Sequence, residues 1–182
     1  VVNNHAAGYI GGIDLSLTTA TITNVTVVGN TSGNGGGIGM SGGSSVDIAN
    51  SIVWENTGEE VWNYNSSVNV IYSDIQGGYE GEGNINADPL FNDAVVGDYG
   101  LQEGSPCIDA GTADLDQDGV EDIAEYMGIA PDMGAFESVV SINPPTNVSY
   151  VPQTSSVMLV WNDVSESYSY KVEKSLAEDF SV

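Results

Sequence analysis

Residues 36–57 read GGIGMSGGSSVDIANSIVWENT, and the features of this stretch occur once already earlier in the chain. Its first three residues, Gly36-Gly37-Ile38, repeat Gly11-Gly12-Ile13 at a distance of 25 residues. In its middle, Asp47-Ile48-Ala49-Asn50 repeats Thr21-Ile22-Thr23-Asn24 at a distance of 26 residues. Short β-rich runs that recur at this period, separated by Gly and Asn, are typical of stacked repeat arrays. The sequence therefore predicts an all-β fold, a parallel β-helix (solenoid).

A third, shorter copy of the pattern follows 22 residues after the second. Equivalent residues of successive coils stack in such a fold, so Ile22 is expected in register with Ile48 and Val70. Asn24 and Asn50 recur at one place and are candidates for a ladder of stacked Asn side chains that satisfy each other's amides. The alternative is that each Asn only begins a turn, because Asn tolerates the left-handed backbone conformation.

The charge of the chain is strongly one-sided. It has 26 Asp and Glu but only two Lys and Arg together, which gives a formal net charge of -24 at pH 7. Nucleic acids and anionic membranes bind basic surfaces, so the composition argues against both and favours cations, neutral glycans or other surface proteins as partners. Most of the carboxylates lie between Asp74 and Glu137, where there is no Lys or Arg. This distribution indicates bound divalent cations or, alternatively, a salt-adapted soluble surface.

Cysteine and histidine are too few for several common kinds of site. Cys107 is the only cysteine, which excludes a disulfide within the chain, and its setting in Ser105-Pro106-Cys107-Ile108 predicts a small buried position. His5 is the only histidine, and we do not expect a nucleophilic Cys/His pair. The sequence shows no signal peptide, no starting Met and no membrane-spanning run. We therefore expect an internal piece of a longer protein, without membrane insertion in this segment.

The chain is predicted to have four parts. Residues 1–78 form the coils, and residues 79–138, which are rich in turn residues, form the end or cap region that closes the solenoid. Residues 139–145 are a linker. Residues 146–182 carry alternating β patterns, with antiparallel strands expected at 147–151 and 156–161 and a third strand at 168–174.

The motif with the clearest chemistry is residues 114–125, DLDQDGVEDIAE, which fits the calcium-loop pattern D-x-D-x-D-G-x5-E in full. In this pattern the carboxylates converge as the loop wraps, and the glycine permits a sharp turn. Residues 121–127 are expected to form a helix after the loop, and the alternative is a solvated acidic turn. Oxygen ligands without His or Cys favour Ca²⁺, and the predicted ligands are Asp114, Asp116, Asp118, the carbonyl of Val120, Asp122 and Glu125.

Three aromatic residues are further candidates. Trp54 stands 26 residues after Val28, so we expect it at the same coil position, in or next to the core. Trp62 and Tyr64 are two residues apart in a predicted strand, so we expect them to share one exposed face. They are candidates for glycan contact, because aromatic rings stack on sugar rings. The alternative is that they pack under a neighbouring loop or domain.

Several stretches together carry a family resemblance. They are residues 50–56 (NSIVWEN), 72–78 (YSDIQGG), 87–91 (ADPLF), 104–111 (GSPCIDAG) and 132–137 (DMGAFE). Residues 11–137 thereby resemble the C-terminal region of secreted right-handed parallel β-helix repeat proteins of the choice-of-anchor Q type. The resemblance implies an exported, extracellular or cell-surface bacterial or archaeal protein, often multidomain and anchored further along the chain. It implies no particular catalytic activity.

A second resemblance lies in the last part of the chain. Pro-Pro-Thr-Asn-Val from Pro144, Val-Met-Leu-Val-Trp-Asn around Trp161 and Tyr-x-Tyr-x-Val around Tyr170 resemble the first half of a fibronectin type III domain. The resemblance implies that Trp161 and Tyr170 are core residues. Such a sandwich needs about 100 residues, and the chain ends well before that. Either the domain is cut or another strand completes it, which would allow self-association by strand addition at residues 146–182.

The function that we expect is a structural or adhesive module of an exported cell-surface or extracellular-fibre protein, stabilised by calcium. Residues 1–143 contain no Lys or Arg, although lyases that act on uronic acids need basic groups, and no nucleophile and base are paired. An enzyme is therefore not predicted. The alternative is a fragment of a β-helix enzyme that binds or degrades polysaccharides and has its active site in missing N-terminal coils.

Overall fold

The computed structural model describes residues 1–138, 149–152 and 157–160, and the chain divides into two compact units, residues 1–140 and 141–182. The described residues are all-β and contain no helix, so none of their elements is a helix that could cross a membrane. The first unit contains three parallel sheets of three strands, in the orders β1-β4-β7, β2-β5-β8 and β3-β6-β9. Each sheet therefore takes one strand from each of three successive passes of the chain.

The strands of these sheets are short and rich in Val, Ile and Thr, residues that suit a pleated and partly buried surface. Their bounds are β1 (Ile13–Ser16), β2 (Thr19–Thr23), β3 (Thr26–Val28), β4 (Ile38–Ser41), β5 (Ser45–Ala49), β6 (Ile52–Trp54), β7 (Val61–Tyr64), β8 (Ser67–Ile71) and β9 (Asp74–Ile75).

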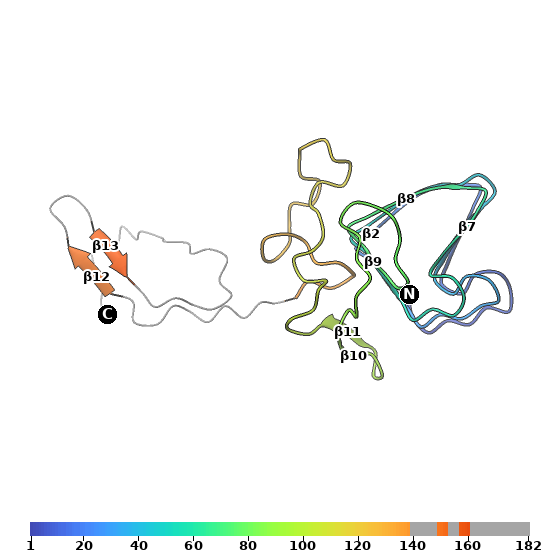
Figure 1. Ribbon diagram of the computed structural model, residues 1–182, viewed down its shortest axis with the longest axis horizontal. Coiled ribbons are helices and arrows are strands. Elements are labelled where there is room, and N and C mark those ends of the chain that lie inside the picture. The colour runs from blue at the N-terminus through green and yellow to red at the C-terminus, as the bar shows by residue number, and fades with distance from the viewer. Residues whose placement is uncertain (139–148, 153–156, 161–182) are drawn as a thin grey trace. The chain divides into compact units, whose positions relative to one another are not determined.

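We call each pass of the chain a coil: β1 to β3, β4 to β6 and β7 to β9. In Figure 1 the coils lie one behind another, with β7, β8 and β9 on three different sides. All neighbouring strands in these sheets are parallel. The arrangement is compatible with the predicted parallel β-helix.

The register of the sheets follows the sequence repeat. Ile22 pairs with Ile48, and Ile48 pairs with Val70, as predicted. Val28 pairs with Trp54, which also confirms the expected position of that tryptophan. Equivalent apolar residues of successive coils thus stack in columns, and the buried core between the sheets consists of Ile22, Val27, Ile38, Met40, Val46, Ile48, Val53, Val61, Val70 and Ile75.

The expected ladder of Asn24 and Asn50 is not formed. Both residues have positive φ, 53° and 48°, and mark one corner of successive coils, so the turn alternative is the correct one. The side chain of Asn50 bonds to the backbone of Thr112 instead. A ladder does occur elsewhere: the backbone and side-chain nitrogens of each Asn donate to the Oδ1 of the next, all at 2.9 Å, in the series Asn4, Asn30 and Asn56.

Residues 79–138, which we call the side region, do not continue the three sheets. They contain one antiparallel pair, β10 (Phe91–Asp93) and β11 (Asp98–Leu101), and they lie beside the coils near β9 in Figure 1. Only a short part covers the last coil: Tyr72 N donates to Glu82 O, and Asp74 pairs with Ile85. Most of the predicted cap therefore covers a side of the coils and not their end.

The side region packs against the outer face of sheet β3-β6-β9. Thr26, Ile52 and Asp74 are in register on this face, while their neighbours in the strands point into the main core. Ile52 forms a second core cluster with Cys107 and Met133, all at most 1% exposed. The side region thus seals a row of outward-facing side chains.

The described residues of the second unit form two antiparallel strands, β12 (Ser149–Pro152) and β13 (Val157–Val160), with Ser149 opposite Val160. This pairing confirms the antiparallel arrangement expected for the two patterns. The predicted linker, the third strand at 168–174, Trp161 and Tyr170 lie outside the described residues.

Candidate metal centre

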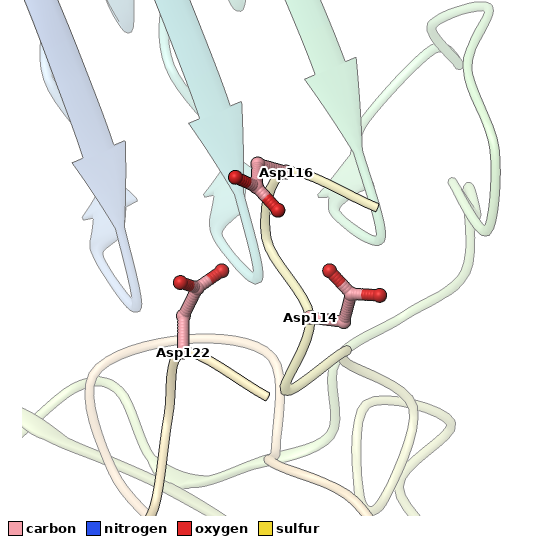
Figure 2. Close-up of side chains that lie close together, drawn as sticks. All are labelled: Asp114, Asp116 and Asp122. Carbon is pink, nitrogen blue, oxygen red and sulfur yellow. The ribbon is translucent and has the colours of Figure 1, made fainter. Parts of the chain in front are cut away.

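Three of the predicted calcium ligands come together in the side region. Asp114, Asp116 and Asp122 each present a carboxylate oxygen, and these oxygens lie within 4.8 Å of one another. Figure 2 shows the three carboxylates turned toward one another from two segments of the loop. Two oxygens that each lie 2.3–2.6 Å from one Ca²⁺ are at most about 5 Å apart. The spacing therefore fits a single ion.

Hydrogen bonds within the loop account for its tight shape. The carboxylate of Asp114 accepts the backbone N–H groups of Asp118 at 3.1 Å and Gly119 at 2.8 Å. The Oδ2 of Asp122 accepts the N–H of Leu115 at 2.9 Å, which brings the end of the loop back to its beginning. Gly119 has a φ of 90°, a conformation that glycine adopts without strain. The predicted role of this glycine at the turn is confirmed.

The other predicted ligands do not belong to the triad. Asp118 Oδ1 accepts the N–H of Val120 at 2.8 Å, and Glu125 is exposed outside the group. The helix predicted for residues 121–127 is wrong, because this segment is irregular. The N–H groups of Asp122 and Ile123 both donate to Ala113 O, which turns the chain back across the loop. Without a helix, Glu125 is not carried toward the three aspartates.

The loop is tied to the coils on two sides. Asn50 and Thr112 exchange two hydrogen bonds, and Thr112 Oγ1 accepts the N–H of Asp114 at 3.2 Å. Gln117 Nε2 donates to Glu82 Oε2 at 2.8 Å, within the segment that covers the last coil. The triad is therefore positioned by the coils and not only by its own loop.

Burial shifts the pKa of several acidic groups outside the loop. Asp74 is fully buried, and burial raises its pKa to about 6. Burial also raises the pKa of Glu60 and that of Glu137. Cys107 donates its thiol hydrogen to Asp74 Oδ2 at 3.3 Å, and burial together with the Asp74 carboxylate raises the pKa of the thiol. Cys107 is buried, as predicted, and the thiol stays protonated; its partner Asp74 was not predicted.

The aromatic pair lies on β7, apart from the acidic loop. The rings of Trp62 and Tyr64 have centroids 5.8 Å apart and planes that differ by 8°, so they are stacked. Tyr64 is 64% exposed, and Trp62 is partly buried. The two rings lie together, as predicted, but only Tyr64 is fully on the exposed side, because Trp62 is partly buried.

A scan of protein-family models gave no match for this chain, and neither did searches of the curated proteins and of the solved structures. The resemblances to β-helix repeat proteins of the choice-of-anchor Q type and to fibronectin type III domains therefore stay predictions.

Proposed function

We propose that this chain is a structural or adhesive module of an exported cell-surface or extracellular-fibre protein, and that calcium stabilises it. In this proposal the three coils are a right-handed parallel β-helix that forms a stiff rod. The side region locks one face of the rod through the acidic loop. Residues 146–182 belong to a fibronectin type III-like sandwich that joins the rod to the next module, or to a second subunit by strand addition.

The observation that carries the proposal is the acidic triad and its attachment to the coils. Three carboxylates held within 4.8 Å of one another repel each other, and residues 1–138 contain no Lys or Arg to offset their charge. A divalent cation removes this repulsion, and hard carboxylate oxygens are suitable ligands for Ca²⁺. Because Asn50 and Thr112 link the loop to the coils, the ion would also stabilise the contact between the side region and the coils.

Thermal unfolding of the full chain in excess CaCl₂ and in EDTA tests the proposal. Ca²⁺ is expected to raise the midpoint by several degrees, because a ligand that binds only the native state stabilises it. The variant Asp116→Asn/Asp122→Asn should lose this rise. The matched control Asp93→Asn/Glu103→Gln removes two exposed charges elsewhere in the side region and should keep it. If the unfolding midpoint is the same in CaCl₂ and in EDTA for all three proteins, the calcium site is refuted.

A second candidate function, binding of neutral glycans, is favoured by the stacked pair of Trp62 and Tyr64. Nearly parallel rings with one exposed member offer a flat apolar surface to a sugar ring. The acidic chain disfavours anionic glycans. Calorimetric titration with neutral cello- and xylo-oligosaccharides should show binding that Tyr64→Ala weakens, whereas Tyr9→Ala, which removes another exposed tyrosine, should not. Equal heats for both variants would refute this site.

A further inference from the structure

The two residues that precede the first strand of each coil change in the last coil. Gly11-Gly12 precedes β1 and Gly36-Gly37 precedes β4, but Glu59-Glu60 precedes β7. Because β1, β4 and β7 pair in register, the three pairs stand in one column. In the third coil, two glutamates therefore replace the repeated glycines.

Stacking explains the glycines. A β-carbon on Gly12 would collide with the carbonyl oxygen of Gly37, and a β-carbon on Gly37 would collide with that of Glu60. The β-carbon on Gly37 would also lie 2.8 Å from Val53 Cγ1. The obstructing carbonyl belongs to the following coil in both cases. Glycine is thus required wherever another coil follows, and a side chain fits at Glu60 because β7 has β4 as its only partner among the described strands.

Glu60 also ends the Asn ladder. Asn4 bonds to Asn30 and Asn30 to Asn56, each time with two nitrogens donating to one Oδ1. Asn56 donates in the same way, but its backbone N–H goes to Glu60 Oε1 and its Nδ2 to Glu60 Oε2. The Glu60 carboxylate takes the place that the Asn of a further coil would occupy. The ladder therefore has no free donor left for a further coil.

The glutamates precede β7, whose second edge is paired with no other strand in the part of the chain that the structure describes. Residues of the side region cover β8 and β9, since Asn84 Nδ2 donates to Val70 O and Ile75 N to Ile85 O. At the start of β7, a hollow of about 390 Å³ remains, which is lined by Glu59, Glu60, Val61, Ile75 and Tyr79, among others. An open strand edge is a template for a further strand, and charged side chains that point inward are one means of blocking it.

We propose that Glu59 and Glu60 prevent a second copy of this chain from pairing with the unpaired edge of β7. A second copy is the relevant partner because two β7 edges can pair around a two-fold axis, which needs no other sequence. Such a pairing brings the same two glutamates of both copies together in a protein that has a net charge of -24. It also removes the remaining exposure of Glu60, which is 9% exposed, and brings no cation to its carboxylate.

The test replaces both glutamates with glycine, the residue at the equivalent positions of the two earlier coils. Sedimentation velocity of the full chain over a range of concentrations should show a monomer for the wild type. The variant Glu59→Gly/Glu60→Gly should self-associate at least tenfold more tightly. Hydrogen exchange of the associated variant should be slowed at residues 61–64, which locates the contact on β7. Glu59→Gln/Glu60→Gln removes the charge, and because an amide has one accepting oxygen, position 60 keeps only one of its two hydrogen bonds from Asn56. This variant should associate more tightly than the wild type and more weakly than the glycine variant.

The control Asp93→Asn/Glu103→Gln removes two exposed charges far from β7 in the sequence and should stay monomeric. Circular dichroism of each variant shows whether it folds, and if the glycine variant does not fold, the glutamine variant decides. A wild type that already associates through residues 61–64 would overturn the proposal. Folded variants that remain monomeric at the highest concentration would overturn it as well.

Discussion

Asn50 and Thr112 are 62 residues apart, yet the Nδ2 of Asn50 donates to Thr112 O and Thr112 N donates to Asn50 Oδ1, both at 2.8 Å. Thr112 Oγ1 in turn accepts the N–H of Asp114. Asn50 stands at a corner of the second coil, and Asp114 is a member of the acidic triad. The coils and the candidate metal loop are therefore joined through two consecutive hydrogen-bonded contacts.

The first prediction concerns this connection. Asn50→Ala removes both hydrogen bonds and leaves the backbone groups of Thr112 without these partners, which should lower the free energy of unfolding by about 2 kcal/mol. Urea unfolding in EDTA measures this loss without a contribution from calcium.

Asn24→Ala is the matched control for Asn50→Ala. Asn24 occupies the same corner one coil earlier, with a φ of 53° against 48°, so the backbone strain of an alanine is similar at the two positions. Asn24 Oδ1 is buried without a hydrogen-bond partner, so its loss costs little. Equal destabilisation by the two substitutions would show that the Thr112 contact contributes nothing beyond the corner itself.

The second prediction concerns the close approach of the coils. Gly37→Ala places a β-carbon against the carbonyl of Glu60 and 2.8 Å from Val53 Cγ1, so neighbouring coils must move apart. Overpacking of this kind costs about 3 kcal/mol, which urea unfolding would detect. At Gly33 the nearest atom to a β-carbon is 3.7 Å away, so Gly33→Ala should change stability little. If neither substitution lowers the free energy of unfolding, the close approach of Gly37 to Glu60 and Val53 is contradicted.

The third prediction concerns pH. The pKa of Asp74 is raised to about 6 in the folded chain, so the folded state binds a proton more tightly than the unfolded state does. This contribution to stability is full below pH 4 or so and is lost as the pH rises through about 6. The loss is on the order of 3 kcal/mol, since each pKa unit corresponds to about 1.4 kcal/mol.

Urea unfolding between pH 4 and pH 8, in EDTA, measures this dependence. Asp74→Asn keeps the shape of the side chain but cannot ionise, so the variant should lose the part of the decline that is centred near pH 6. Asp47→Asn, at an exposed position of β5, is the control and should retain the wild-type profile. An unchanged profile in Asp74→Asn would assign the pH dependence to other groups.

Much of the coil architecture could be predicted because the sequence of the coils repeats at a nearly constant spacing. The columns of Ile22 with Ile48 and of Val28 with Trp54 follow from a constant spacing, since each coil repeats the same path. The Asn ladder predicted at Asn24 and Asn50 forms at Asn4, Asn30 and Asn56 instead. Asn30 and Asn56 are also 26 residues apart, and Asn4 stands 26 residues before Asn30, so a search for three-fold recurrence would have favoured this column.

The side region was harder to predict because tertiary contacts determine its path. The acidic pattern predicts converging carboxylates, and Asp114 and Asp116 do converge, but Asp122 joins them in place of Asp118. Local propensity suggested a helix from residue 121, but the hydrogen bonds of Asp122 and Ile123 to Ala113 compete with it. Nothing in the repeat indicated that Asp74 would face Cys107, 33 residues away.

The most direct test of the calcium proposal is calorimetric titration of CaCl₂ into the metal-free full chain at pH 7. Ca²⁺ is expected to bind one site in the wild type and in the control Asp93→Asn/Glu103→Gln, and Asp116→Asn/Asp122→Asn should abolish this binding. Mg²⁺ at the same concentration should bind more weakly, because it requires stricter octahedral geometry. Absence of saturable binding in the wild type, or equal binding in the variant that lacks Asp116 and Asp122, would contradict a calcium-stabilised module.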